Sequence, residues 1–140
     1  MGGGWSTLPF VHRSSTLQFM SENTYKTDGT IDTFPNRFPG RDYVIQFTAP
    51  EFTSVCPMTG QPDFGTIMLT YTPGERCIEL RSFKFYLHTF RSRGIFYEDV
   101  VNTILDDVVA AIAPEFAEVQ GEFNTRGGIS ATITASYPDE

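Results

Sequence analysis

The period of the apolar residues changes twice along this chain, and that change restricts the fold more than any other feature. Between Glu98 and Ile112 the apolar side chains recur at spacings of three and four residues, which predicts an amphipathic helix. Carboxylates in its first turn suit the helix dipole, and Pro114 follows its end. Residues 82–93 repeat this spacing and predict an earlier helix, with Ser82 as a candidate N-cap.

Strand-like runs lie on both sides of the two helical segments. They are rich in β-branched and aromatic residues and cover residues 43–48, 65–72, 115–123 and 127–137. Residues 77–80 could carry strand character out of the turn at Pro73 and Gly74. The last two runs meet at NTRGG, residues 124–128, which is typical of a hairpin. The order strand, strand, helix, helix, strand, strand predicts an α+β domain with an antiparallel sheet and helices on one face.

The first 41 residues lack such a period and are rich in Gly, Ser, Thr, Pro and Asn. They predict an N-terminal arm, residues 1–41, that packs on the domain or on a neighbour, followed by a single domain, residues 42–140. A sheet of four strands leaves both of its edges open. We expect a homo-oligomer that closes those edges and places binding clefts between subunits.

The charge of the chain restricts its partners. A formal net charge of -7 argues against direct, non-specific binding of nucleic acid as the main activity. Half of the basic residues nevertheless fall between positions 76 and 93. This strip is either a site for an anionic ligand or a solvated helix face.

Cysteine content and hydropathy favour a cytoplasmic protein. Two cysteines are too few for a disulfide framework, which suits a reducing compartment. No apolar run approaches the length of a membrane span, and no secretory signal is visible. The two histidines, His12 and His88, stand far apart, so we expect no protein-built metal site.

Cys56 lies in a stretch rich in turn-forming residues, FTSVCPMTGQPDF, residues 52–64. Such residues do not suit the interior of a helix or strand, so the stretch is interpreted as a loop. A cysteine on a loop can be accessible to solvent, unlike the buried and inert majority. On these residues alone, a reactive thiol and an incidental one are equally good interpretations.

Three segments, in the same order, resemble the 7-cyano-7-deazaguanine reductase family. They are the Cys56 loop, CIELRSFKFYLHTFRSRGIFYEDVVN (residues 77–102) and TRGGIS (residues 125–130). The family's signature falls on ELRSFKFY, where Arg81 replaces a lysine and Phe85 replaces a leucine or tyrosine. The resemblance implies a tunnelling fold assembled into an oligomeric barrel. It also implies reduction of the nitrile of 7-cyano-7-deazaguanine to an aminomethyl group with NADPH, in queuosine biosynthesis.

The resemblance further implies a role for each of ten residues. Cys56 is the nucleophile that forms a covalent thioimide, and Asp63 is the proton donor. Glu98 binds the base of the substrate, with Tyr97 beside it. The remaining residues are Ile78, Glu79 and Leu80, which line the substrate pocket, and Arg81, Lys84 and Arg126, which bind the phosphates of NADPH.

The chemistry of these side chains agrees with such roles. A nitrile carbon is electrophilic, and a thiolate is the strongest common nucleophile among side chains. A carboxylate such as Glu98 can accept two adjacent donors of a purine-like base as a bidentate pair. The chain has no GxGxxG or P-loop motif, so NADPH is implied by the resemblance alone.

Two residues leave questions open. Tyr97 stands where well-known relatives carry histidine, and it either transfers a proton or only shapes the pocket. Tyrosine can donate a hydrogen bond, but its ordinary pKa of about 10 makes it a poor proton shuttle at neutral pH. Cys77 matches no motif, and we expect it to be structural.

Other functions remain compatible with these residues. A tRNA-linked nitrile amidinotransferase of the same fold shares the cysteine chemistry and needs no NADPH, although the acidic net charge and the pair Arg81 and Lys84 argue against it. A GTP cyclohydrolase-like activity would require metal ligands, and the chain offers few. A non-catalytic module that only binds a deazapurine predicts no covalent adduct.

Overall fold

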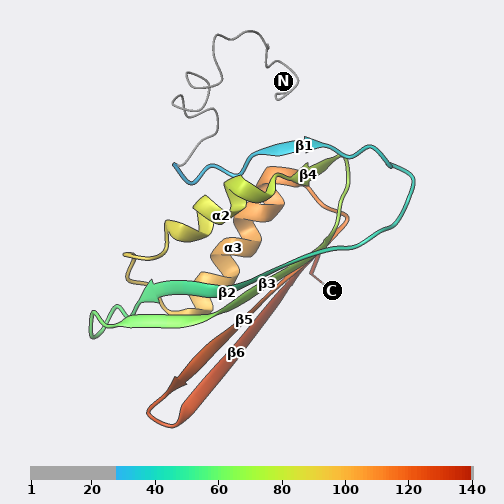
Figure 1. The fold of residues 1–140 in the computed structure, drawn as a ribbon. Helices are drawn as coiled ribbons and strands as arrows, with labels where there is room; N and C mark the ends of the chain where they lie inside the picture. Colours follow the sequence, from blue (N-terminus) through green and yellow to red (C-terminus); the bar gives the residue numbers. More distant parts are fainter. Residues whose placement is uncertain (1–27, 140) are drawn as a thin grey trace, which may run out of the picture.

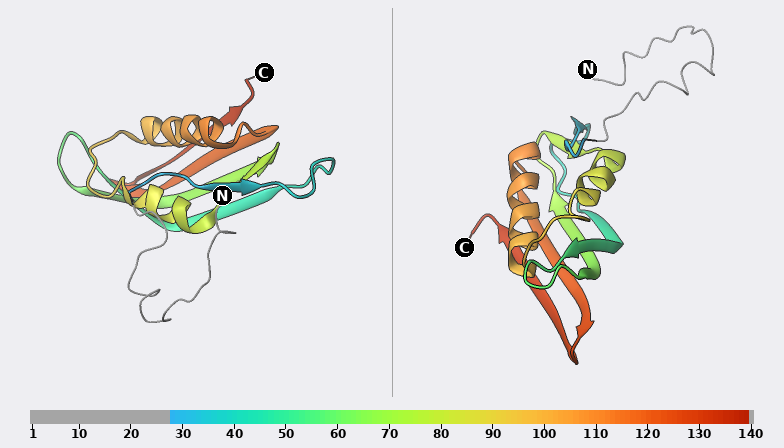
Figure 2. Two further views of the ribbon diagram at one scale, coloured as in Figure 1. Left: turned by 90° about the horizontal axis from the view of Figure 1, so that it is seen from above. Right: turned by 90° about the vertical axis from the view of Figure 1, so that its left-hand side faces the viewer.

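Four long strands form one antiparallel sheet in the order β2-β3-β5-β6 (Figure 1). The computed structural model describes residues 28–139. The strands are β2 (Ile45–Val55), β3 (Pro62–Thr72), β5 (Phe116–Arg126) and β6 (Ile129–Tyr137). Two helices, α2 (Leu80–His88) and α3 (Tyr97–Ile112), cover one face, α2 over β2 and α3 over β5 and β6 (Figure 2). The predicted α+β class, the antiparallel sheet and the placement of the helices are confirmed.

A second, two-stranded sheet joins β1 (Thr33–Pro35) to β4 (Arg76–Ile78). The sequence did not predict β1, because three residues that end in proline carry no readable period. The side chain of Arg76 holds the pair together by donating hydrogen bonds to the hydroxyl and the carbonyl of Thr33. β1 lies within residues 1–41, the predicted arm, and residues 1–27 of that arm lie outside the described residues.

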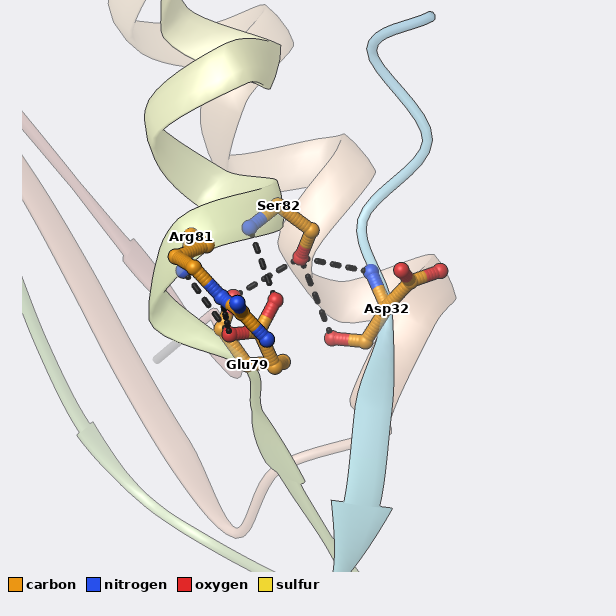
Figure 3. Close-up of polar contacts among 4 residues, drawn as sticks. All are labelled: Asp32, Glu79, Arg81 and Ser82. Atoms are coloured by element: carbon orange, nitrogen blue, oxygen red, sulfur yellow. Dashed lines mark hydrogen bonds and ion pairs between the residues drawn. The ribbon is translucent and has the colours of Figure 1, made fainter. Parts of the chain in front are cut away.

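The start of α2 differs from the prediction. Glu79, rather than Ser82, is the N-cap, and its carboxylate accepts from the backbone N–H of Arg81 at 3.0 Å and of Ser82 at 2.8 Å (Figure 3). Ser82 lies inside the helix, where its hydroxyl accepts from the backbone N–H of Asp32 at 2.8 Å. A carboxylate one turn earlier satisfies two of the helix's free N–H groups, which a serine already bonded elsewhere cannot do.

The strand β2 is longer than the sequence predicted, and the loop after it is shorter. The pairing of β2 with β3 shifts between Ala49 and Phe52, which marks a β-bulge. Beyond the bulge the strand continues to Val55, directly before Cys56. The turn-forming residues are confined to positions 57–61, so the expectation of a loop over the whole of residues 52–64 is wrong.

The core lies between the sheet and the helices. Its fully buried members come from both layers: Ile67, Leu69, Tyr71 and Val119 on the sheet, and Val100, Val101, Ile104 and Val108 on α3. The α3 residues have the predicted helical spacing, and α3 ends where predicted, with Ala113 in a left-handed conformation before Pro114. The periodicity therefore identified the buried face of this helix correctly.

Gly121 lets α3 approach the sheet closely. A Cβ atom at this position would lie 2.9 Å from Val101 Cγ2 and 2.8 Å from the ring of Phe123. Overpacking of this kind costs about 1–3 kcal/mol, so we expect Gly121→Ala to lower the free energy of unfolding by that amount. Urea denaturation at equal protein concentration measures it.

Gly40→Ala is the matched control, because a Cβ atom at Gly40 would meet nothing within 4 Å. We expect this variant to unfold like the parent protein. An equal loss of stability in both variants would show that close packing at Gly121 is not the cause.

The sheet is open at both edges. Within residues 28–139, no further strand pairs with the outer side of β2 or of β6. Such edges are templates for pairing with another chain. None of the helices in this part of the chain is both long and apolar enough to cross a membrane.

Candidate active site

The loop between β2 and β3 folds back tightly on Cys56. The backbone N–H of Cys56 donates to the carbonyl of Gln61, and the N–H of Gly60 donates to the carbonyl of Cys56, both at 2.8 Å. Gly60 has a φ of 74°, a left-handed conformation that glycine adopts without strain. The reversal brings the start of β3 beside the end of β2, so Cys56 and Asp63 line the same pocket.

The pocket has a volume of about 260 Å³, below the range of about 300–1,000 Å³ that is common for small-molecule sites. It opens to solvent at the end of the sheet that carries the Cys56 loop. Its walls are formed by Cys56, Pro57, Asp63, Ile95, Phe96, Tyr97, Glu98 and Arg126. Five of the ten residues that the sequence assigned to the site therefore meet here.

The loop around Cys56 changes the acidity of its thiol. The thiol is free and half-buried. A hydrogen bond from the hydroxyl of Thr59 and others from the backbone N–H groups of Met58 and Thr59 lower its pKa, while burial and the charge of Asp63 oppose them. The loop thus favours the thiolate, which is the reactive form of cysteine.

Asp63 is almost fully buried, with 4% of its surface exposed. Its Oδ1 atom accepts a hydrogen bond from the hydroxyl of Tyr97 at 3.1 Å and forms an ion pair with Nη1 of Arg126. Arg126 also donates to the carbonyl of Pro62 at 3.3 Å, which ties the end of β5 to the start of β3. Tyr97 and Arg126 therefore hold the carboxylate of Asp63 through the same oxygen.

Tyr97 is held by two contacts, one with Asp63 and one with Phe123. Its ring stacks on Phe123, with ring centroids 3.9 Å apart and planes 5° from parallel. Burial, followed by the hydrogen bond to Asp63, raises the pKa of Tyr97 above its ordinary value. The hydroxyl therefore keeps its proton at neutral pH and donates a hydrogen bond to Asp63.

Glu98 presents an open carboxylate to the pocket. It lies in the first turn of α3 and is exposed. Within the described part of the chain its carboxylate makes no hydrogen bond or ion pair, while its backbone carbonyl accepts from Asn102. Both carboxylate oxygens can therefore accept donors from a ligand.

The other five assigned residues lie elsewhere in the chain. Ile78 is buried in the core, Glu79 caps α2, and Leu80 is 58% exposed. Arg81 and Lys84 are exposed on α2, where Arg81 contacts the carboxylate of Glu79 and Lys84 lies over the ring of Phe85. Figure 1 shows α2 beginning beside β4, away from the end of the sheet that carries residues 56–61.

Sequence reasoning missed several residues of the site. Phe96 and Ile95 line the pocket, and their position directly before Tyr97 was an available signal. Phe123 carried no local signal, because only the packing of β5 under α3 brings it to Tyr97. Cys77 is buried, with its sulfur 3.7 Å from the hydroxyl of Tyr43. No cluster of three metal-ligating side chains occurs among the described residues.

Together the fold and the pocket define an α+β protein of the tunnelling-fold class, with a cysteine thiol of lowered pKa in its pocket. One solved structure of similar fold is titled "Crystal structure of the archaeosine synthase QueF-Like in the apo form". It has a TM-score of 0.59 and 22% sequence identity, and the match covers 67% of this chain and 90% of that chain. At this identity the similarity shows the fold alone.

Sequence comparison identifies the family. The model of the family described as "QueF-like protein" matches residues 62–140. A protein of Chloroherpeton thalassium named NADPH-dependent 7-cyano-7-deazaguanine reductase is 54% identical over 110 residues, 79% of this chain and 95% of the relative. A protein of the same name from Anaeromyxobacter sp. (strain K) is 57% identical over 107 residues, 76% of this chain and 88% of the relative. The chain belongs to this family, the QueF-like 7-cyano-7-deazaguanine reductases.

Proposed function

We propose that this chain reduces the nitrile of 7-cyano-7-deazaguanine to an aminomethyl group with NADPH, as a cytoplasmic step of queuosine biosynthesis. The observation that carries the proposal is the pocket itself. There a thiol of lowered pKa, Cys56, shares one small cavity with a buried carboxylate, Asp63, and an open one, Glu98. The names of the relatives specify the nitrile and the reductant.

Formation of the covalent intermediate can be written with Cys56 and Asp63 alone. The thiol loses its proton to the Asp63 carboxylate, and the thiolate sulfur attacks the nitrile carbon. A carbon–sulfur bond forms while one π bond of the nitrile breaks, and the nitrogen takes the proton back from Asp63. The product is a thioimide, and no proton enters or leaves the site. These steps begin from the carboxylate form of Asp63, which the ion pair with Arg126 suits.

Glu98 and Tyr97 orient the substrate for that attack. The carboxylate of Glu98 accepts the adjacent N–H and amino donors of the base, and such charge-assisted pairs are strong and directional. Tyr97 keeps Asp63 facing the pocket through its hydroxyl. This assigns Tyr97 the second of its two possible roles, shaping the site without exchanging a proton.

Bound NADPH supplies the hydrides that reduce the thioimide to the amine. Exposed cations suit its phosphate groups, and Arg81 and Lys84 lie three residues apart on α2, so they address one side of the helix. Arg126 stands at the mouth of the pocket with 42% of its side chain exposed. These three residues would hold the cofactor.

The separation of the two groups of residues supports an inter-subunit site. One chain contributes Cys56, Asp63, Tyr97, Glu98 and Arg126, and we propose that a second chain contributes the start of α2, with Ile78, Glu79 and Leu80. The small volume of the pocket and the open edges of β2 and β6 are consistent with such completion. The protein would then be a homo-oligomer, and its substrate is the free base rather than a nucleic acid.

The direct test is an assay with purified protein, 7-cyano-7-deazaguanine and NADPH. We expect loss of NADPH absorbance and appearance of the aminomethyl base by mass spectrometry. Formation of a covalent adduct without any consumption of NADPH would instead favour the amidinotransferase. The absence of both adduct and product would indicate a binding module.

The cofactor assignment gives a separate prediction. A charged hydrogen bond contributes about 1.5–3 kcal/mol, so we expect Arg81→Ala/Lys84→Ala to raise the KM for NADPH about tenfold or more. Steady-state kinetics measures the change, and the covalent adduct should form normally because it needs no reductant. Arg91→Ala, which removes another exposed cation of the same strip, is the control. An unchanged KM in the double variant would show that NADPH binds elsewhere.

A further inference from the structure

Ser54, the cross-strand partner of Asp63, has an unsatisfied hydroxyl. Its side chain is fully buried, and among the described residues its Oγ is the one buried side-chain nitrogen or oxygen without a hydrogen-bond partner. Leaving such a group unpaired is costly, so a native protein usually provides a partner or a use for it. Ser54 therefore needs an explanation that the fold alone does not supply.

The nearest cross-strand neighbour of Ser54 is Asp63. The two residues are direct partners in the pairing of β2 with β3, beyond the bulge between Ala49 and Phe52. Directly opposed side chains of an antiparallel pair project from the same face, with Cβ atoms about 4.5–5.5 Å apart. Both residues are buried on that face. A serine hydroxyl can span the remaining gap to a carboxylate by rotation about its χ1 angle.

Asp63 has an oxygen available for this contact. The hydroxyl of Tyr97 and the guanidinium of Arg126 both engage Oδ1. In the described part of the chain, no donor contacts Oδ2. The buried hydroxyl without a partner and the carboxylate oxygen without a donor thus belong to opposed residues.

We propose that Ser54 is a positioning residue for Asp63, with its hydroxyl bonded to Oδ2 in solution and during the reaction. The inference rests on the proposed function and deepens it. A hydroxyl can donate to the ionised carboxylate and accept from the protonated one, whereas the guanidinium of Arg126 can only donate. Ser54 can therefore hold Asp63 in place both before and after it takes the thiol proton.

The kinetic test compares Ser54→Ala with wild type. We expect the pH-independent kcat to fall about tenfold with the KM for the nitrile unchanged, because the misplaced acid still allows substrate binding. We also expect the acid limb of the kcat profile to move to higher pH, since the ionised carboxylate, which is the form that takes the thiol proton, loses a donor that favours it. The other titratable groups that face Asp63 are Cys56, Tyr97 and Arg126, with Glu98 in the same pocket. The Ser54→Ala variant retains all four of these residues.

Thr53→Ala is the matched control, because Thr53 is adjacent on the opposite face of β2 and its hydroxyl donates to the carbonyl of Glu51 in its own strand. It should leave both kcat and the pH profile unchanged. If Ser54→Ala has the kcat and profile of an active wild type, the role of Ser54 is wrong while the proposed function stands. A fall in kcat without a shift of the limb would also overturn it, since a general loosening of the fold explains that result.

A thermodynamic cycle tests the same contact without any assay of activity. Ser54→Ala should lower Tm in the wild-type background and leave it unchanged in the Asp63→Ala background, because the hydrogen bond needs both partners. Additive changes in Tm would overturn the inference. Failure of the wild type to consume nitrile would overturn the proposed function alone, and the cycle would still decide the contact.

Discussion

Mixed with 7-cyano-7-deazaguanine and no NADPH, this chain is expected to gain the mass of one substrate molecule per subunit. Cys56→Ala is expected to gain nothing and to lose turnover. The loop around Cys56 lowers the pKa of the thiol through the hydroxyl of Thr59 and two backbone N–H groups, which favours the nucleophilic thiolate. Intact-mass spectrometry under non-reducing conditions measures the adduct directly.

Cys77 supplies the control for this experiment. It is the second cysteine of the chain, and it is buried with 4% of its surface exposed. Cys77→Ala should form the adduct like wild type. An adduct that persists in Cys56→Ala, or normal turnover by that variant, would exclude the thioimide mechanism.

Replacement of Asp63 should have opposite effects on turnover and on the reactivity of the Cys56 thiol. A positioned general acid contributes about 10²- to 10⁴-fold, so we expect Asp63→Asn to lower kcat by a factor in that range. The charge of Asp63 raises the pKa of Cys56, and its removal should lower that pKa further. The thiol should then react faster with iodoacetamide at neutral pH even though the enzyme turns over more slowly.

The opposite signs of these two effects make the result diagnostic. A variant that merely unfolds would lose turnover and would also lose the distinction between Cys56 and Cys77 in alkylation. Asp99→Asn, which removes an exposed carboxylate from the same turn of α3 as Glu98, should change neither measurement. Slower alkylation of Cys56 in Asp63→Asn would show that Asp63 does not act on the thiol through its charge.

The positions of Ser54 and Glu79 could not be predicted from the spacing of residues along the sequence. Ser54 opposes Asp63 only because the bulge between Ala49 and Phe52 shifts the pairing of β2 with β3 by one residue. Without that shift Ser54 would face Pro62, and a shift of one residue changes which side chains share a face. Glu79 caps α2 because Ser82 is engaged by Asp32, fifty positions away in the chain. The register at Ser54 and the bond between Ser82 and Asp32 both depend on distant segments, so neither could be read from the local sequence.

The sequence by itself determined the two helices, the succession of the four long strands along the chain and the motif residues that meet in the pocket. These features follow from the period of the apolar side chains and from short segments, and both are local properties. Only the tertiary structure decided the pairing of β1 with β4, the place of Phe123 beneath Tyr97, and the division of the assigned residues into two groups. Each of these depends on which distant segments pack together, because strand register and helix placement are settled by burial of the whole core rather than by any one stretch of the chain.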